Sequence, residues 1–141
     1  MPRLERETPS GANSGIEVKT SPISGRGVFA TKEFQPNDVV LVWDTSHIVD
    51  DKDIDSLSEA DNHAIARYQG KWIVMQPPLR FVNHSCDSNT RPDGGRDMAV
   101  RHVSPGEEIT TDYRPVMKKS ERMECHCGGA SCQGFISGTE E

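Results

Sequence analysis

Four cysteines are spaced so that they could bind one metal ion. Three lie near the C-terminus, Cys125, Cys127 and Cys132, and the fourth, Cys86, lies in the middle of the chain. A structural zinc ion takes four ligands in a tetrahedron, and two cysteines separated by one residue close only a tight local loop. The spacing therefore predicts one zinc ion that ties the tail to the Cys86 segment. The alternatives are a pair of disulfides or four unrelated thiols, and His126 is an alternative ligand.

The start of the chain does not look like a secretory signal. Residues 1–7 carry charges where a signal peptide needs an apolar run, and no later segment approaches the length of a membrane span. We therefore expect a reducing intracellular compartment, the cytoplasm or, in a eukaryote, the nucleus. Thiols stay available to metal there, and metal binding would contribute folding free energy directly.

The length and charge of the chain limit its partners. The 141 residues predict one domain with its own core, and the formal net charge is -6. Because an acidic protein lacks the basic face that binds phosphates, a zinc module for nucleic acid is disfavoured. A protein substrate with a basic, flexible segment is the more natural partner. The acidic stretch at 50–55 either attracts such a segment or is a solvated loop.

Short strands are the elements that must position these residues. Residues 1–15 are polar, charged and rich in Pro, Gly and Ser, which predicts a flexible tail. From Ile16 onward, short apolar or alternating runs are separated by turn-forming residues, so the fold is predicted to be mostly β. The predicted strands are Ile16–Thr20, Gly27–Ala30, Val39–Trp43, Lys71–Met75, Met98–Val103 and Ile109–Tyr113.

One helix is predicted between residues 56 and 70. Ser56 and Glu59 have the spacing of a capping box, and apolar residues recur on one helical face from Leu57 to Ile65. Gly70 would end this helix. One or two short helices in a mostly β chain do not by themselves indicate a function.

Four motifs, in this order, resemble those of the SET-domain protein lysine methyltransferases. They are Gly25–Ala30, Arg80–Asn89, Gly106–Tyr113 and the tail pattern Cys125-x-Cys127-x4-Cys132, which is similar to the post-SET zinc motif of that family. A single Gly-x-Gly is weak evidence, whereas four motifs in the matching order with Cys86 are specific. The likeness runs from about Ile16 to Ile136.

The resemblance implies a fold, a domain division and an activity. The fold would be a SET domain of short strands in small sheets, with one or two short helices and a C-terminal segment that forms a pseudoknot. The SET domain would span 16–115, the post-SET segment 116–136 and a tail 137–141. The activity would be transfer of a methyl group from S-adenosylmethionine to the side-chain amine of a lysine in a protein.

The resemblance also implies which residues bind the methyl donor. The backbone of Arg26, Gly27 and Val28, the side chain of Asn83 and the backbone of His84 would contact S-adenosylmethionine. Glycines allow a backbone to approach a ligand closely, and an amide offers both donors and acceptors. From the residues alone, the glycines equally predict a simple turn, and the Asn-His pair is typical of a turn with a buried histidine.

Tyr113 is the predicted catalytic residue on the same resemblance, although a tyrosine that ends an apolar run is usually a half-buried core residue. The sulfonium of the donor is already activated, so the protein mainly aligns the reactants. The lysine must also be neutral. With a reference pKa near 10.4, this costs about 4 to 5 kcal/mol at neutral pH, which an apolar channel and a nearby cation reduce.

The channel residues and the departures from the family decide how well such a site would work. Phe81, Tyr68 and Trp72 are candidate channel walls, with ordinary core packing as the alternative. Thr111 stands where the family commonly has Phe or Tyr, so the channel would admit a partly methylated lysine or be poorly formed. The stretch from Ala30 to Arg80 is short for the family. This short stretch is typical of a minimal enzyme or of a fragment of a larger protein. Thr111 motivates the second hypothesis, a noncatalytic peptide-binding or scaffolding module.

Overall fold

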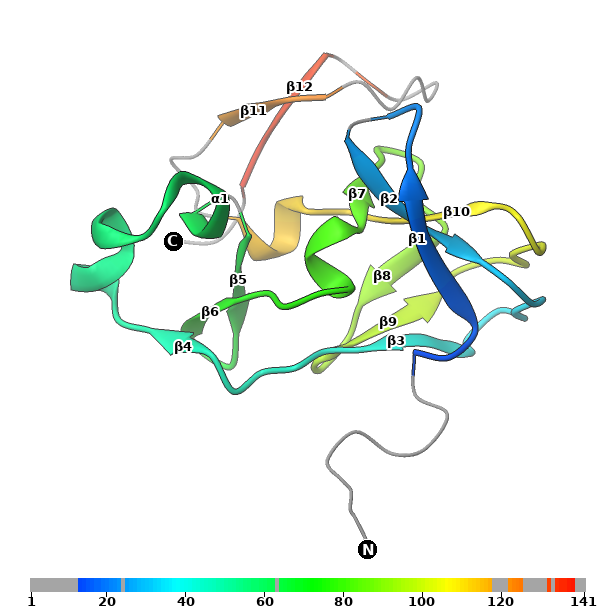
Figure 1. Ribbon diagram of the computed structural model, residues 1–141, viewed down its shortest axis with the longest axis horizontal. Helices are drawn as coiled ribbons and strands as arrows, with labels where there is room; N and C mark the ends of the chain where they lie inside the picture. The colour runs from blue at the N-terminus through cyan, green and yellow to red at the C-terminus, as the bar shows by residue number, and fades with distance from the viewer. Residues whose placement is uncertain are drawn as a thin grey trace, which may run out of the picture.

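The computed structural model describes residues 13–23, 25–62, 64–117, 122–125, 132 and 134–138. Within these residues the chain forms short strands in four small sheets, which confirms the predicted mostly β fold (Figure 1). The strands are β1 (Ile16–Thr20), β2 (Arg26–Ala30), β3 (Val39–Val42), β4 (Ile48–Val49), β5 (Ile65–Tyr68), β6 (Lys71–Val74), β7 (Asn83–His84), β8 (Thr90–Pro92), β9 (Arg96–Ala99), β10 (Glu108–Thr111), β11 (Arg122–Glu124) and β12 (Phe135–Ser137). The helices are the 3-10 helices η1 (Asp51–Ser56), η2 (Leu79–Phe81) and η3 (Arg114–Val116) and the α-helix α1 (Glu59–Asn62).

The largest sheet brings the sequence motifs together. Its strand order is β1-β2-β10-β7. Antiparallel pairing sets Ile109 of β10 opposite Val28 of β2, and both side chains are fully buried. On its other edge β10 pairs in parallel with β7, so that Thr111 lies opposite His84. This parallel pairing places two of the sequence motifs side by side.

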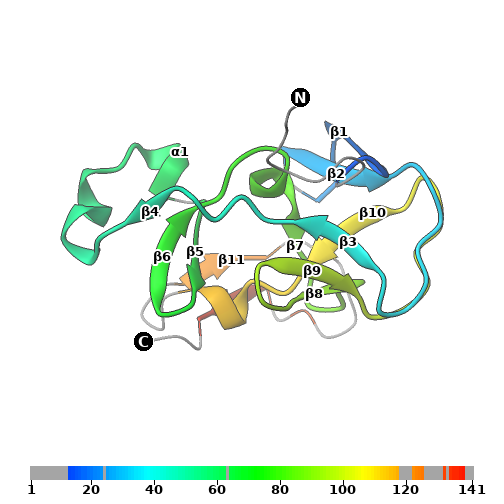
Figure 2. The same cartoon turned by 90° about the horizontal axis from the view of Figure 1, so that it is seen from below.

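The remaining sheets surround this centre. The β3-β9-β8 sheet lies at the same end of the molecule as β1 and β2, while the β4-β6-β5 sheet and α1 form the opposite end (Figures 1 and 2). Strands β11 and β12 pair with each other and lie along the top edge of the view in Figure 1. Met117, Cys125 and Ile136 of the C-terminal segment form a cluster against which Cys86 and Tyr113 pack. The C-terminal segment therefore covers the region where the motifs meet.

The predicted helix from residue 56 to residue 70 is wrong beyond its first turns. The helical part is η1 and the four-residue α1, and the Ser58 hydroxyl caps α1 by accepting a hydrogen bond from the Asp61 N–H at 3.1 Å. Ile65–Tyr68 instead forms β5, which pairs with β6. Gln69 and Gly70 both have positive φ, 50° and 78°, as a tight hairpin turn requires. Gly70 lies in the turn between β5 and β6 rather than at the end of a helix.

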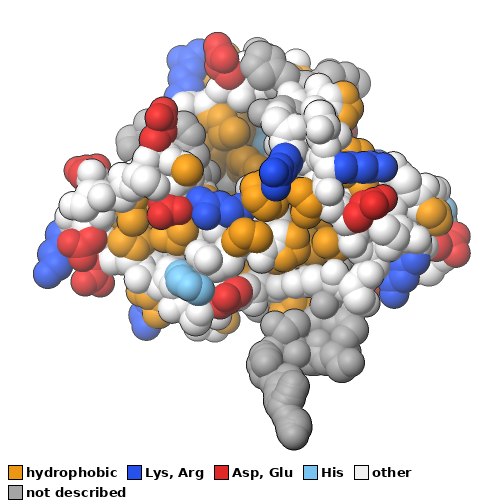
Figure 3. All heavy atoms as spheres, viewed as in Figure 1, with side chains coloured by type: hydrophobic (Ala, Val, Ile, Leu, Met, Phe, Trp, Pro, Cys, Tyr) orange, Lys and Arg blue, Asp and Glu red, His pale blue; other side chains and the backbone are white. Residues whose placement is uncertain are grey.

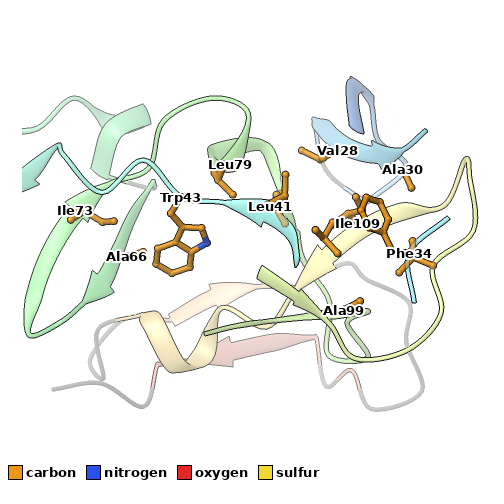
Figure 4. Packing of buried hydrophobic residues seen from close by; sticks show 13 residues of the cluster. Val28, Ala30, Phe34, Leu41, Trp43, Ala66, Ile73, Leu79, Ala99 and Ile109 are labelled. Atoms are coloured by element: carbon orange, nitrogen blue, oxygen red, sulfur yellow. The ribbon is translucent and has the colours of Figure 1, made fainter. Parts of the chain in front are cut away.

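One hydrophobic core joins three of the sheets. Its residues come from both ends of the molecule, and Trp43 lies between Ala66 and Leu41 (Figure 4). The buried members are Val28, Ala30, Phe34, Val40, Leu41, Trp43, Ala66, Ile73, Leu79, Val82, Ala99, Val103 and Ile109. This continuous core holds the ends of β7, β9 and β10 in fixed positions.

The predicted N-terminal tail, 1–15, lies mostly outside the described residues. Of its last three residues, Asn13 exchanges two hydrogen bonds with the Val42 backbone, at 2.8 and 3.1 Å, and the Gly15 carbonyl accepts one from the Thr31 N–H at 2.9 Å. Among the residues described, none of the helices is long and apolar enough to cross a membrane.

Candidate active site

A cavity of about 70 Å³ lies at the C-terminal end of β10. Most of its wall is apolar, and Thr111 and Tyr113 contribute to it from β10 and the residues after it. Its other lining residues come from η2, β5, β9 and the C-terminal segment, and include Trp43, Leu79, Val82, Asp97, Met117 and Met123. On the face seen in Figure 3, hydrophobic side chains gather in a hollow below β11 and β12. The site is therefore built by the whole domain together with its C-terminal segment.

Tyr113 is fixed at both its backbone and its hydroxyl. Its hydroxyl donates a hydrogen bond to the Val82 carbonyl, and its backbone N–H donates to His84 Nδ1 at 3.0 Å. Burial raises the pKa of the Tyr113 phenol, and the negative charges of Asp97 and Glu108 raise it further. The phenol is therefore neutral across the physiological range and acts as a hydrogen-bond donor.

His84 links Tyr113 to the cysteines. Because Nδ1 accepts the hydrogen bond from Tyr113, the ring proton lies on Nε2, which is 3.4 Å from the Cys86 sulfur. Burial lowers the pKa of His84, although Asp112 opposes this effect, so the ring is neutral at pH 7. A neutral imidazole that donates to sulfur cannot also bind a metal through that nitrogen. His84 thus orients Cys86 rather than acting as a ligand.

The sulfurs of Cys86 and Cys125 lie at a separation that suits zinc. They are 3.9 Å apart, and two thiolates at the usual Zn–S distance on a tetrahedral ion lie about 3.8 Å apart. The Cys132 sulfur is 3.8 Å from the Cys125 carbonyl oxygen. No disulfide is formed among the described cysteines, Cys86, Cys125 and Cys132. Cys127 and His126 lie outside the described residues.

A second polar cluster surrounds Asn83. Its side-chain N–H groups donate to the Arg26 carbonyl and to the Glu108 carboxylate, both at 3.0 Å. The same carboxylate accepts hydrogen bonds from the Ser21 hydroxyl at 2.8 and 2.9 Å. A Cβ at Gly27 would lie 2.3 Å from a Glu108 oxygen, so only glycine leaves room for this carboxylate. The sequence motif indicated the glycine and the asparagine but not Ser21.

The structure separates the predicted channel residues. Thr111 lines the cavity, whereas Phe81, Tyr68 and Trp72 are not among its described lining residues. Phe81 packs under the Arg26 guanidinium, 5.5 Å from its ring centre, beside the Asn83 cluster. Tyr68 and Trp72 belong to the β5-β6 hairpin, where Trp72 is buried and Tyr68 packs against the core.

Several lining residues were not anticipated from the sequence, among them Trp43, Asp97, Met117 and Met123. Met117 and Met123 extend from the C-terminal segment into the cavity wall, and no motif marks them. Asp97 is the more informative case, because it is a buried carboxylate on a core strand. An acidic residue just before the apolar run at Met98 was the available signal, but it is also typical of a strand that has one exposed position.

Comparison with known proteins places the chain in a family. A family model described as the SET domain matches residues 25–114, which is more than half of the chain. The chain therefore belongs to the SET-domain family. The matched range contains β2, β7 and β10 and most of the residues that line the cavity, while Val116, Met117 and Met123 follow it.

Several similar proteins carry names of one kind. Human "Histone-lysine N-methyltransferase 2B" is 26% identical over 151 residues, covering 94% of this chain and 6% of that protein. "Histone-lysine N-methyltransferase, H3 lysine-36 specific" of Kluyveromyces lactis is 36% identical over 144 residues, covering 90% and 20%. "Histone-lysine N-methyltransferase, H3 lysine-4 specific" of Saccharomyces cerevisiae is 38% identical over 68 residues, covering 41% and 6%. The chain thus spans a small part of each relative.

Proposed function

We propose that this chain methylates the side-chain amine of lysine in a protein substrate, with S-adenosylmethionine as the methyl donor. The observation that carries the proposal is the convergence of the family motifs on one cavity. The parallel pairing of β7 with β10 sets the Asn83-His84 segment beside Thr111, and Tyr113 follows in the cavity wall. The names of the similar proteins support the same activity.

The residues around Asn83 suit the proposed methyl donor. Asn83, the Arg26 carbonyl and the Glu108 carboxylate present an amide and oxygen acceptors to a ligand that carries both an ammonium and a carboxylate. Gly25 has a φ of 48° and open space where a Cβ would lie. We propose that Arg26, Gly27, Val28, Asn83 and His84 hold S-adenosylmethionine. When bound, that molecule supplies a methyl group activated by its sulfonium.

The cavity residues would hold and prepare the lysine. Tyr113 keeps its proton and is fixed by Val82, so its ring and hydroxyl offer a rigid surface against which the amine aligns. The apolar lining, which includes Leu79 and Met117, excludes water and favours the neutral amine. Thr111 leaves more space at the end of the cavity than a tyrosine would.

The cysteines would bind one structural zinc ion. We propose Cys86, Cys125, Cys127 and Cys132 as its ligands, supported by the sulfur separation of Cys86 and Cys125 and by the absence of a disulfide among the described cysteines. Such an ion holds the post-SET segment against the SET domain. Because Met117 and Cys125 pack in one cluster with Tyr113, the ion would also support the cavity wall.

The proposed substrate is a protein with a lysine in a basic, flexible segment, such as a histone tail. The net charge of -6 favours a basic partner, and the similar proteins are named for histone lysines. A histone substrate would place the activity in the nucleus of a eukaryotic cell.

A methyl-transfer assay tests this function. The protein is incubated with methyl-labelled S-adenosylmethionine and either a histone H3 tail peptide or the same peptide with every lysine replaced by arginine. We expect label only on the lysine peptide, located on the side-chain nitrogen by mass spectrometry. If the chain binds the peptide but transfers label neither to it nor to other basic proteins, the result would instead support the noncatalytic module.

A further inference from the structure

Unpartnered polar atoms are concentrated in the cavity. Among the described residues, three buried side-chain atoms have no hydrogen-bond partner, and they are Trp43 Nε1, Asp97 Oδ1 and Thr111 Oγ1. All three residues line the same cavity. Buried polar groups are nearly always paired in folded proteins. Three exceptions in one mostly apolar cavity therefore form one polar site in its wall.

Asp97 is the charged member of this site. It lies on β9, the central strand of its sheet, and is 2% exposed. Within the described part of the chain no Lys, Arg or His forms an ion pair with it. The Trp43 indole lies close enough to lower the pKa of Asp97, but burial has the larger effect and raises that pKa to about 7. The indole makes no hydrogen bond of normal geometry to the Oδ1 atom.

A buried carboxyl group without an ion-pair partner does not stabilise a fold. Apolar residues surround Asp97 on both neighbouring strands, with Leu41 and Pro92 opposite it. An apolar side chain at this position would pack without a desolvation cost. The polar site thus costs stability, which is typical of a site that binds a ligand rather than of a structural contact.

The chemistry of the three atoms defines the ligand. A carboxylate attracts a cation and accepts N–H hydrogen bonds, the threonine hydroxyl can donate or accept, and the indole donates. The other charged residue that lines the cavity is Arg80, whose guanidinium is held by the Asp61 carboxylate at 2.8 Å. On the adjacent strand β8, Arg91 is exposed and paired with Asp93. Asp97 therefore provides the negative charge available to a cation in the cavity.

We propose that Asp97, with Thr111 and Trp43 beside it, is the group that recognises the substrate amine in the cavity. The inference rests on the proposed function, since Tyr113 lines the same cavity. Asp97 accepts a hydrogen bond from an amine N–H, so the site prefers amines that still carry a hydrogen over a fully methylated one. Chains that are apolar at this position would lack that preference.

The same contact allows the amine to become a nucleophile. Burial raises the pKa of Asp97 to about 7, and the apolar wall lowers the pKa of a bound amine, so the two pKa values approach each other and the proton can move from the amine to the carboxylate. When it moves to Asp97, the N–H bond breaks, an O–H bond forms, and the electron pair stays on nitrogen. The buried carboxylic acid is then neutral in an apolar wall, and it releases its proton to water when the cavity opens.

Amine binding can be measured without methyl transfer. The probes are n-butylammonium, its trimethylated form and the uncharged n-pentanol, titrated into the full chain without methyl donor. The indole N–H signal of Trp43 in a nitrogen-15 NMR spectrum reports occupation of the cavity, and that of Trp72, which does not line it, is the internal control. We expect the dissociation constant of n-butylammonium, measured from the shift of the Trp43 signal, to be at least ~10-fold lower than that of either other probe.

A pair of isosteric variants assigns the effect. Asp97→Asn should weaken n-butylammonium binding ~10-fold or more and remove the preference over n-pentanol, while remaining folded because it removes a buried charge. Asp93→Asn makes the same change of charge on an exposed residue and should bind like the wild type. Equal affinities for the three probes, or wild-type affinity in Asp97→Asn, would overturn the proposal.

The amine-binding experiment and the methyl-transfer assay can fail independently of each other. Selective amine binding in a chain that transfers no methyl group would leave Asp97 as an amine-binding residue and reject the enzymatic function. Methyl transfer that is unchanged in Asp97→Asn, in both KM and kcat, would reject the role of Asp97 and keep the enzyme.

Discussion

Tyr113 and Asn83 occupy different parts of the proposed site, so their variants should separate two steps. Tyr113→Phe removes a hydroxyl fixed on the Val82 carbonyl in the cavity wall, but leaves the Asn83 cluster intact. We expect kcat to fall ~100-fold or more with little change in the dissociation constant of S-adenosylmethionine. Asn83→Ala should instead weaken donor binding. Calorimetric donor binding together with single-turnover methyl transfer checks both, and equal losses through donor affinity alone would contradict these roles.

Thr111 should set how many methyl groups the lysine receives. Its side chain is buried and its hydroxyl has no partner among the described residues, so it fills the cavity end only partly. We expect the wild type to proceed beyond monomethyl-lysine, and Thr111→Tyr to stop there because the larger ring occupies the remaining space. Product mass spectra on one peptide measure this. A wild type that stops at monomethyl-lysine would assign the limit to another residue.

Asp97 should make the stability of the fold depend on pH. Its pKa is about 7 in the folded chain, above its ordinary value of 3.8. As the pH rises through this interval, the unfolded chain loses the proton while the folded chain keeps it, so the free energy of unfolding falls, by up to ~4 kcal/mol. Urea unfolding of wild type and Asp97→Asn across this interval measures the difference, with Asp93→Asn as control. If the free energy of unfolding depends on pH in the same way in the wild type and in Asp97→Asn, that result would contradict the burial assigned to Asp97.

At the level of single residues, the sequence indicates a candidate only where a motif carries the information. Tyr113, Thr111 and Asn83 were predicted because their neighbours along the chain resemble a family pattern. Trp43 and Asp97 were not, because their roles depend on strands β3 and β9 meeting the end of β10. From the sequence pattern alone, a charged residue in a strand is predicted to be exposed, and only its neighbours in space show that it is buried.

A strand or helix can be predicted from the sequence when local contacts form it, and is missed when contacts with distant segments form it. Strand β1 was predicted at its observed bounds, Ile16–Thr20, because alternation within the segment suffices. The two-residue strand β7 has no such local signal, since it exists only through its pairing with β10. The segment from Ile65 to Gly70 was predicted as helix from its apolar spacing, but pairing with β6 overrides that local pattern.

The C-terminal segment should depend on the proposed zinc ion. The small cluster of Met117, Cys125 and Ile136 is the described apolar contact that attaches it to Tyr113, and such a small core cannot hold a segment by itself. We expect the wild type to contain one zinc per chain by elemental analysis, and Cys86→Ser to lose it together with most methyl transfer, while β1 to β10 stay folded. Ser85→Ala is a neighbouring control. Full zinc content in Cys86→Ser would exclude this ligand.

Taken as a whole, the molecule is a small domain with a site closed by its own C-terminal segment. It spans only 6% to 20% of the similar histone-lysine methyltransferases cited above. The cavity nevertheless draws lining residues from both ends of the molecule, because β3, β5, β9 and β10 share one core. The additional parts of larger relatives are therefore not needed to build the cavity wall, although substrate choice can depend on the surface outside it.

The surface charge should then govern how a substrate is captured. With a net charge of -6, the chain attracts basic segments over a distance that salt shortens to about 8 Å at physiological ionic strength. We expect KM for a basic lysine peptide to rise several-fold between low and physiological salt, with kcat unchanged, because the amine is bound in a buried cavity that salt screens little. A peptide with the same lysine and neutral neighbours is the control, and its KM should hardly change. A kcat that falls with salt while KM stays constant would show that the exposed charges act on the transfer step and not on capture.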